Sequence, residues 1–286
     1  MWQLIVGQLL NGAIVGTLYG IVALGVTLTF GITGIVNFAL GVFMMLGAYA
    51  AWYFADTVGL PYPLAVLTAV VVTSFAGLVA DQALFRFTRN NLVNGLLVSI
   101  GMIAVMESSA LLIWTSTPKE MHHVLPGVFA FFGLVVPKMK LVVFGLLLAV
   151  IFATYAALTK TWSGRAAYAY AQNAEAAALM GVPTSRLQTG VVVYSTGLAG
   201  LAGALYASLY SLEPTLGSLF ILKAVEAAIL AGIGSVAGAL LGGIILGVTE
   251  GVGSIYLPLA FRDAYGLVFL VVILLFKPSG LFAGRR

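Results

Sequence analysis

Few side chains of this chain could carry out acid–base, nucleophilic or metal chemistry, and those few form no recognisable set. The 286 residues include two histidines, nine acidic residues and no cysteine. His122 and His123 are adjacent, so they cannot share a helix face as the two histidines of a helical zinc motif do. The phosphate-binding pattern G-x-x-x-x-G-K-[S/T] does not occur. The sequence therefore predicts that the chain is not an enzyme and that it binds no metal or cofactor; if ATP drives it, another subunit binds the ATP.

Carboxylates and amides inside apolar segments are the remaining functional candidates. Glu107, Glu226 and Glu250 lie in or near such segments, where a charge costs about 3 kcal/mol or more. Lys223 lies on the same helix face as Glu226, three residues earlier, so an ion pair within the helix and a role in a solute pathway are both open. The amides Asn37 and Asn94 could equally hold two helices together. The pathway candidates are Asn37, Asn94 and Glu226.

The elements that must position these residues are transmembrane helices. Hydrophobic residues make up 62% of the chain and charged residues 8%, a composition that no soluble core could absorb. Crossing the hydrocarbon takes about 20 apolar residues in a helix, and short alternating segments typical of an outer-membrane barrel are absent. We expect an all-α polytopic bundle in a single domain, 1–286. The apolar spans are 4–30, 35–55, 62–84, 92–114, 141–159, 189–211, 222–256 and 264–276.

The span 222–256 is too long for one ordinary crossing. It carries Gly232, Gly234 and Gly238 near its middle, which predicts two short, broken or re-entrant helices. The plain count is therefore eight spans, and nine or ten are the alternative. An uncharged N-terminus outside and a basic C-terminal tail inside require an odd number of crossings, which favours the split.

Basic residues predict which loops face the cytoplasm. The connection 160–188 is predicted to be cytoplasmic, and the same side is predicted for the loop after 84 and for the tail. The lysines of the connection 115–140 count against this assignment. The supporting residues are Arg86, Arg89, Lys160, Arg165, Arg186, Lys277, Arg285 and Arg286, and the opposing ones are Lys119, Lys138 and Lys140. The charge is too scattered for a nucleic-acid surface, so no nucleic-acid partner is expected.

Small residues recur at a spacing of four, which lets helix backbones approach closely in lipid. Helix packing is the expected role, within this subunit or against a sister subunit, and a direct pathway role is the alternative. The stripes are Gly12, Gly16 and Gly20, then Gly234, Gly238 and Gly242, with Gly243, Gly247 and Gly251 interleaved.

The connection 160–188 contains a short predicted helix. Residues 174–180 are strong helix formers, Gly181 is a natural C-terminal stop, and Pro183 prevents continuation. Small side chains with one exposed acid would suit docking into a groove of a partner, and a solvated linker helix is the alternative. The predicted docking residues are Asn173, Ala174, Glu175, Ala176, Ala177, Leu179, Met180 and Gly181.

This segment resembles the coupling loop of binding-protein-dependent ABC permeases of the branched-chain amino-acid (LivH-type) family. The resemblance runs along nearly the whole chain, through the stretches 11–25, 31–49, 172–182, 224–235 and 276–282. It implies a multi-pass subunit of the bacterial inner membrane that forms half of an alternating-access pathway. The implied partners are a LivM-type permease, two cytoplasmic ATPases with ATP and Mg²⁺, and a periplasmic solute-binding protein.

The solute and the transport class leave alternatives open. Where the family often has histidine this chain has Leu40, and where a second glycine is usual it has Ala231. Branched-chain or other amino acids are expected, with urea, amides, and aliphatic or aromatic acids as alternatives. An ion-coupled secondary transporter is the rival class, and it would need an intramembrane relay of carboxylates or histidines.

Overall fold

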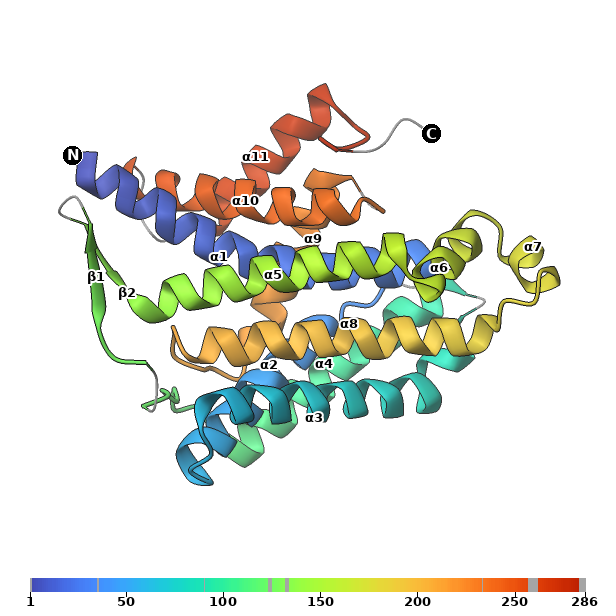
Figure 1. Cartoon of the computed structure of the whole chain (residues 1–286), viewed down its shortest axis with the longest axis horizontal. Helices are drawn as coiled ribbons and strands as arrows, with labels where there is room; N and C mark the ends of the chain where they lie inside the picture. The colour runs from blue at the N-terminus through green and yellow to red at the C-terminus, as the bar shows by residue number, and fades with distance from the viewer. Residues whose placement is uncertain are drawn as a thin grey trace.

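The computed structural model describes residues 2–34, 36–89, 91–122, 125–131, 134–232, 234–256 and 262–282, which form a helical bundle with one small hairpin (Figure 1). The long apolar runs become helices because a helix satisfies every backbone polar group within its own segment. The α-helices are α1 Trp2–Leu28, α2 Leu40–Trp52, α3 Tyr62–Ala83, α4 Leu92–Trp114, α5 Lys138–Lys160, α6 Trp162–Gln172, α7 Ala174–Leu179, α8 Thr184–Ala207, α9 Leu216–Ala231, α10 Val236–Tyr256 and α11 Arg262–Phe276.

Shorter elements complete this part of the chain. Two π-helical turns, η1 Thr29–Thr33 and η2 Tyr53–Thr57, extend α1 and α2, and a 3₁₀ turn, η3 Phe85–Phe87, follows α3. The strands β1 Val128–Phe131 and β2 Leu134–Pro137 form an antiparallel hairpin in which Val128 pairs with Pro137. This hairpin was not predicted for the connection 115–140.

The bundle has two distinguishable ends (Figure 1). The N-terminus and the β1–β2 hairpin lie at one end, called here the hairpin end, whereas α6 and α7 lie at the opposite end, called the α6 end. At the hairpin end, two of the lysines that opposed the predicted topology have internal partners. Lys140 Nζ donates to Asn11 Oδ1 at 2.7 Å, and Lys119 Nζ lies 5.7 Å from the ring centroid of Trp52.

Six helical segments of the described chain are long and apolar enough to cross a membrane, so the predicted eight to ten crossings are not confirmed. The six are Trp2–Thr33, Tyr62–Phe87, Leu92–Trp114, Lys138–Lys160, Thr184–Ala207 and Gly238–Tyr256. The α-helices α2 and α9 have 13 and 16 residues, which span only about 20 and 24 Å. The predicted break in 222–256 is confirmed, because α9 ends at Ala231 and α10 begins at Val236.

The centre of the bundle is built from α1 and α8. The most apolar stretch of α1 is 89% buried and that of α8 is 72% buried, whereas that of α4 is only 11% buried. Glycines permit the close crossings. A Cβ on Gly16 would lie 2.6 Å from the carbonyl oxygen of Gly243 in α10, and one on Gly47 of α2 would lie 2.5 Å from Gly200 Cα in α8. The backbones therefore touch directly, and larger side chains would force these helices apart.

Candidate functional site

The predicted helix of the connection 160–188 is present as α7. Its N-cap is Asn173, whose Oδ1 accepts a hydrogen bond from the Ala176 N–H at 2.9 Å. Gly181 has a φ of +83°, which a residue with a side chain rarely adopts, and so the chain turns away after one and a half turns of helix. Glu175 lies in the first turn, where its negative charge interacts favourably with the positive end of the helix dipole.

The tip of this connection presents two large apolar side chains to solvent. Leu179 is 84% exposed and Met180 is 86% exposed. Ala174, Glu175 and Ala176 are also exposed, whereas Ala177 is buried on the side of α7 that faces the rest of the chain. In Figure 1, α7 projects beyond the end of the bundle. Exposed apolar groups at a projecting tip are typical of a surface that a partner covers.

The helix α6 holds this tip against the bundle. Ala166 and Ala167 are buried, and Gly164 packs on the backbone of Leu158 at the end of α5. Gln188 Nε2 in α8 donates to the Tyr170 hydroxyl at 2.6 Å. The helix α6 therefore contacts both α5 and α8.

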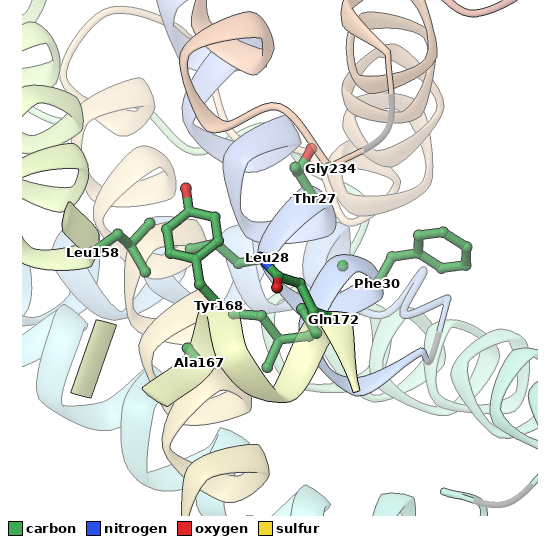
Figure 2. A pocket seen from close by; sticks show the side chains of 11 residues that line it. Thr27, Leu28, Phe30, Leu158, Ala167, Tyr168, Gln172 and Gly234 are labelled. Carbon is green, nitrogen blue, oxygen red and sulfur yellow. The ribbon is translucent and has the colours of Figure 1, made fainter. Parts of the chain in front are cut away.

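A cavity of about 300 Å³ lies where α6 meets the end of α1, η1, the end of α5 and Gly234 of the segment after α9 (Figure 2). Partial burial raises the pKa of the Tyr168 phenol beside this cavity above its ordinary value. The lining residues are Thr27, Leu28, Phe30, Gly31, Ile32, Leu158, Ala167, Tyr168, Ala171, Gln172 and Gly234.

The chain is unwound at Gly34 and at residues 36–39, between η1 and α2. Gly34 has a φ of +70°, and α2 begins only at Leu40. Asn37 in this segment is 1% exposed, and its Oδ1 accepts from the Ala39 N–H at 3.0 Å. Asn37 Nδ2 is buried and has no hydrogen-bond partner among the residues that the structure describes. A buried donor without a partner is uncommon in proteins, so Asn37 fits a site that another molecule or another state completes.

Glu226 belongs to a buried ionic cluster that joins three helices. Lys223 Nζ lies 3.5 Å from Glu226 Oε2 within α9, as the i,i+3 spacing predicted, and 2.9 Å from Glu250 Oε1 of α10. The Tyr19 hydroxyl of α1 donates to Glu250 Oε2 at 3.1 Å. Glu250 is fully buried, and a Cβ on Gly266 of α11 would lie 3.1 Å from its Oε1. The cluster is therefore an interhelical tie rather than an ion pair confined to α9.

The other acidic and amide candidates lie elsewhere. Glu107 Oε1 of α4 accepts from the Ser218 N–H at 3.0 Å, which caps the start of α9. Asn94 is exposed in the first turn of α4, where its N–H bonds to Asn91 Oδ1 at 3.2 Å, so the structure does not place it inside the bundle. The His122 N–H and ring contact Asp56 at the hairpin end, and His123 lies outside the described residues.

The three glycine stripes do not all pack between helices as predicted. Gly12, Gly16 and Gly20 pack on α10 through the interleaved stripe, with a Cβ on Gly12 only 2.5 Å from the Gly247 carbonyl oxygen. Gly242 instead faces the Ala227 backbone of α9, and Gly238 faces Ser235 at the start of its own helix. Gly234 is a turn residue with a φ of +100°, and a Cβ there would meet no atom within 4 Å. The first stripe thus packs between helices, whereas Gly234 does not.

A polar cluster that the sequence analysis missed lies at the α6 end. Arg89 Nη2 donates to both oxygens of Asp81, at 2.9 and 2.7 Å, and to Thr189 Oγ1 at 3.0 Å. Thr189 Oγ1 in turn donates to Asp81 Oδ2 at 2.6 Å. Asp81 is fully buried at the end of α3, and Thr189 lies in α8, just after the connection 160–188. No local spacing signals this contact, because Thr189 is separated from Asp81 by 108 residues.

Comparisons with known proteins agree with this architecture. A family model described as "Branched-chain amino acid transport system / permease component" matches residues 8–277. The chain is 32% identical to the high-affinity branched-chain amino acid transport system permease protein BraD of Pseudomonas aeruginosa, over 96% of this chain and 94% of that protein.

More distant relatives cover the chain to a similar extent. It is 29% identical to the high-affinity permease protein LivH of Escherichia coli, over 96% of this chain and 94% of LivH. It is 27% identical to a probable LivH of Methanocaldococcus jannaschii, over 96% of this chain and 91% of that protein. No solved structure matches the chain significantly. Since the family model spans nearly all of its residues, the chain belongs to the family of permease components of branched-chain amino acid transport systems.

Proposed function

We propose that this chain is the permease subunit of an ATP-driven, binding-protein-dependent importer of branched-chain amino acids in the bacterial inner membrane. The family consists of transport permeases, which are not enzymes. BraD and LivH carry the name of branched-chain amino acid transport systems, and they support this solute over urea, amides, and aliphatic or aromatic acids. The same likeness favours an ABC importer over an ion-coupled secondary transporter.

The observation that carries the proposal is the projecting tip at α7. Leu179 and Met180 are almost fully exposed, yet α6 anchors them to the bundle through buried alanines. In the proposed assembly, these side chains enter a groove of one of two cytoplasmic ATPase subunits, which bind ATP and Mg²⁺. The α6 end then faces the cytoplasm, in agreement with its exposed basic residues Lys160, Arg165 and Arg186.

The mechanism that we propose is mechanical. Closure of the ATPase pair moves α7, and α6 passes the movement to α5, α8 and the cavity beside η1. The unwound segment with Asn37 directly follows η1, so a displacement there would change the position of Asn37. Transport requires that the solute binds differently in the two states, because a ligand with equal affinity for both states shifts nothing. A LivM-type sister permease would supply the other half of the pathway, and a periplasmic binding protein would dock at the hairpin end.

The test is a reconstituted system with the sister permease, both ATPases and the binding protein. Uptake of radiolabelled leucine and ATP hydrolysis are measured in the same vesicles for Leu179→Asp, Glu175→Arg and the matched control Glu175→Gln. We expect the aspartate and arginine variants to reach the membrane but to lose ATPase association and at least tenfold of uptake. The control should transport normally, because its small change leaves the exposed tip apolar.

Normal uptake and full ATPase binding by Leu179→Asp would refute the docking role of the tip. Uptake that persists without ATP and follows an ion gradient would refute the importer itself. Recovery of the chain from native membranes with a sister permease and ATPases would support the assembly, and recovery as a lone homo-oligomer would contradict it.

A further inference from the structure

A groove runs along the bundle between α5 and α8. It consists of two cavities of about 340 and 360 Å³ that share the lining residues Gly190 and Tyr194. The first cavity opens at the α6 end beside Arg186 and Ser163, and the second continues toward Leu201 with α3 as an additional wall. The hydroxyls of Thr154 and Tyr194 hydrogen-bond at 2.6 Å where the two cavities meet.

The dimensions of the groove match one leaflet of a bilayer. From Arg186 to Leu201, α8 rises roughly 22 Å, which is close to the thickness of one leaflet with its headgroup layer. The walls beyond the mouth are mainly aliphatic, with Leu158, Leu187 and Val191 in the first cavity and Val70, Val150 and Val193 in the second. Gly190 is exposed and Tyr194 is 45% exposed, so the groove is open along its side.

The mouth of the groove carries positive charge and hydroxyl groups. Arg186 is exposed, and no ion pair involves it among the residues that the structure describes. Ser163 and Thr161 line the same cavity. The Thr161 hydroxyl donates to the Ala157 carbonyl oxygen at 2.6 Å and lies 3.0 Å from Ser163 Oγ, so Arg186 is the main group for a phosphate there. One basic residue near the membrane surface favours an anionic lipid by about fivefold. The groove is thus polar at its mouth and apolar behind it, which matches the arrangement of a phospholipid headgroup and its acyl chain.

Both cavities are elongated, since each is lined by residues from two or more turns of α8. A single hydrocarbon chain is thin enough to fit. We propose that the groove between α5 and α8 binds an anionic phospholipid, with one acyl chain along the groove and the phosphate at Arg186.

The test uses photoactivatable phosphatidylglycerol with a diazirine at the end of one acyl chain, and phosphatidylethanolamine with the same chain. The full-length chain is illuminated in lipid nanodiscs, alone and in complex with its co-purifying subunits, and the cross-linked peptides are mapped by mass spectrometry. We expect adducts on 190–201 and on 147–157, with about fivefold more from phosphatidylglycerol than from phosphatidylethanolamine.

Two variants with matched controls separate the headgroup from the channel. Arg186→Gln should abolish the headgroup preference, whereas Arg165→Gln, an exposed arginine of α6 that does not line these cavities, should keep it. Gly190→Leu should fill the groove and remove most adducts without harming the fold, because a Cβ there meets no atom within 4 Å. Gly145→Leu, equally open and exposed on α5 but outside the groove, should leave the adducts unchanged.

Three results would overturn the proposal. They are adducts spread evenly over the exposed faces of α3, α4 and α5, adducts unaffected by Gly190→Leu, and loss of the groove adducts in the complex, which would show that a subunit covers the groove. These readouts do not depend on transport, so the lipid site and the importer can fail independently.

Discussion

The buried contact between Asp81 and Arg89 should be worth about 2 to 3 kcal/mol of folding free energy, and it should be measurable by a double-mutant cycle. Arg89 is bound to both carboxylate oxygens, with side-chain exposures of 13% for Arg89 and 1% for Asp81. Removing one partner of a fully buried ion pair costs about 3 to 5 kcal/mol, and the partial exposure of Arg89 places the value toward or below the lower limit. Arg89→Gln should be the more damaging single change, because it leaves the Asp81 charge buried.

The assay is chemical unfolding of the full-length protein in detergent micelles, with Asp81→Asn, Arg89→Gln and the double variant. The double variant should be less destabilised than the sum of the two single variants by about 2 kcal/mol, since neither charge is then left alone. Arg86→Gln is the matched control. Its guanidinium lies over the Phe87 ring at 4.7 Å in an exposed position, and its loss should cost about 0.5 kcal/mol or less.

The reasoning would be refuted if Arg89→Gln cost no more than Arg86→Gln, or if the two single effects were additive. The contact also joins the end of α3 to the start of α8, which follows the connection 160–188 that we propose to dock on the ATPase. We therefore expect Arg89→Gln to lower the ratio of solute transported to ATP hydrolysed, whereas Arg86→Gln should leave it unchanged.

Three further predictions concern the interior. Gly16→Leu should lower the yield of folded protein, because its Cβ would lie 2.6 Å from a backbone oxygen of α10. The control Gly101→Leu, which has open space around it, should not lower the yield. Equal yields of the two variants on size exclusion would contradict this prediction. Lys223→Met should destabilise the protein by about 3 kcal/mol in micelles, because the ammonium 2.9 Å from Glu250 Oε1 is lost. Adding Glu250→Gln should recover part of the lost stability. No recovery would exclude a direct interaction between Lys223 and Glu250. Asn37→Ala should raise the KM for uptake. Its Nδ2 has no partner to lose among the described residues, so the loss of stability should stay near the ~1 kcal/mol of the Oδ1 bond to the Ala39 N–H; a much larger loss would show a structural role instead.

The sequence alone determined those features that depend on neighbours along the chain. Hydropathy is a sum over a local window, so the membrane class, most helix positions and the break between α9 and α10 could be predicted. Helix formers at residues 174–180, with Gly181 as a stop and Pro183 after it, were sufficient to predict α7. The i,i+3 spacing of Lys223 and Glu226 was likewise sufficient to place both on one face.

Only the tertiary structure decided which distant residues meet. The predicted number of crossings is not confirmed, because apolar runs such as 40–52 and 216–231 form α-helices of only 13 and 16 residues, and hydropathy alone does not fix where such helices end. Tyr19 reaches Glu250 across 231 residues, and Thr189 reaches Asp81 across 108. The interleaved glycine stripes gave no indication of which one faces α1, because side-chain spacing defines a helix face but not the neighbour that covers it. Helix rotation and crossing are set by packing of the whole bundle, and this is the physical reason that the ionic cluster, the Asp81–Arg89 contact and the groove between α5 and α8 appear only in three dimensions.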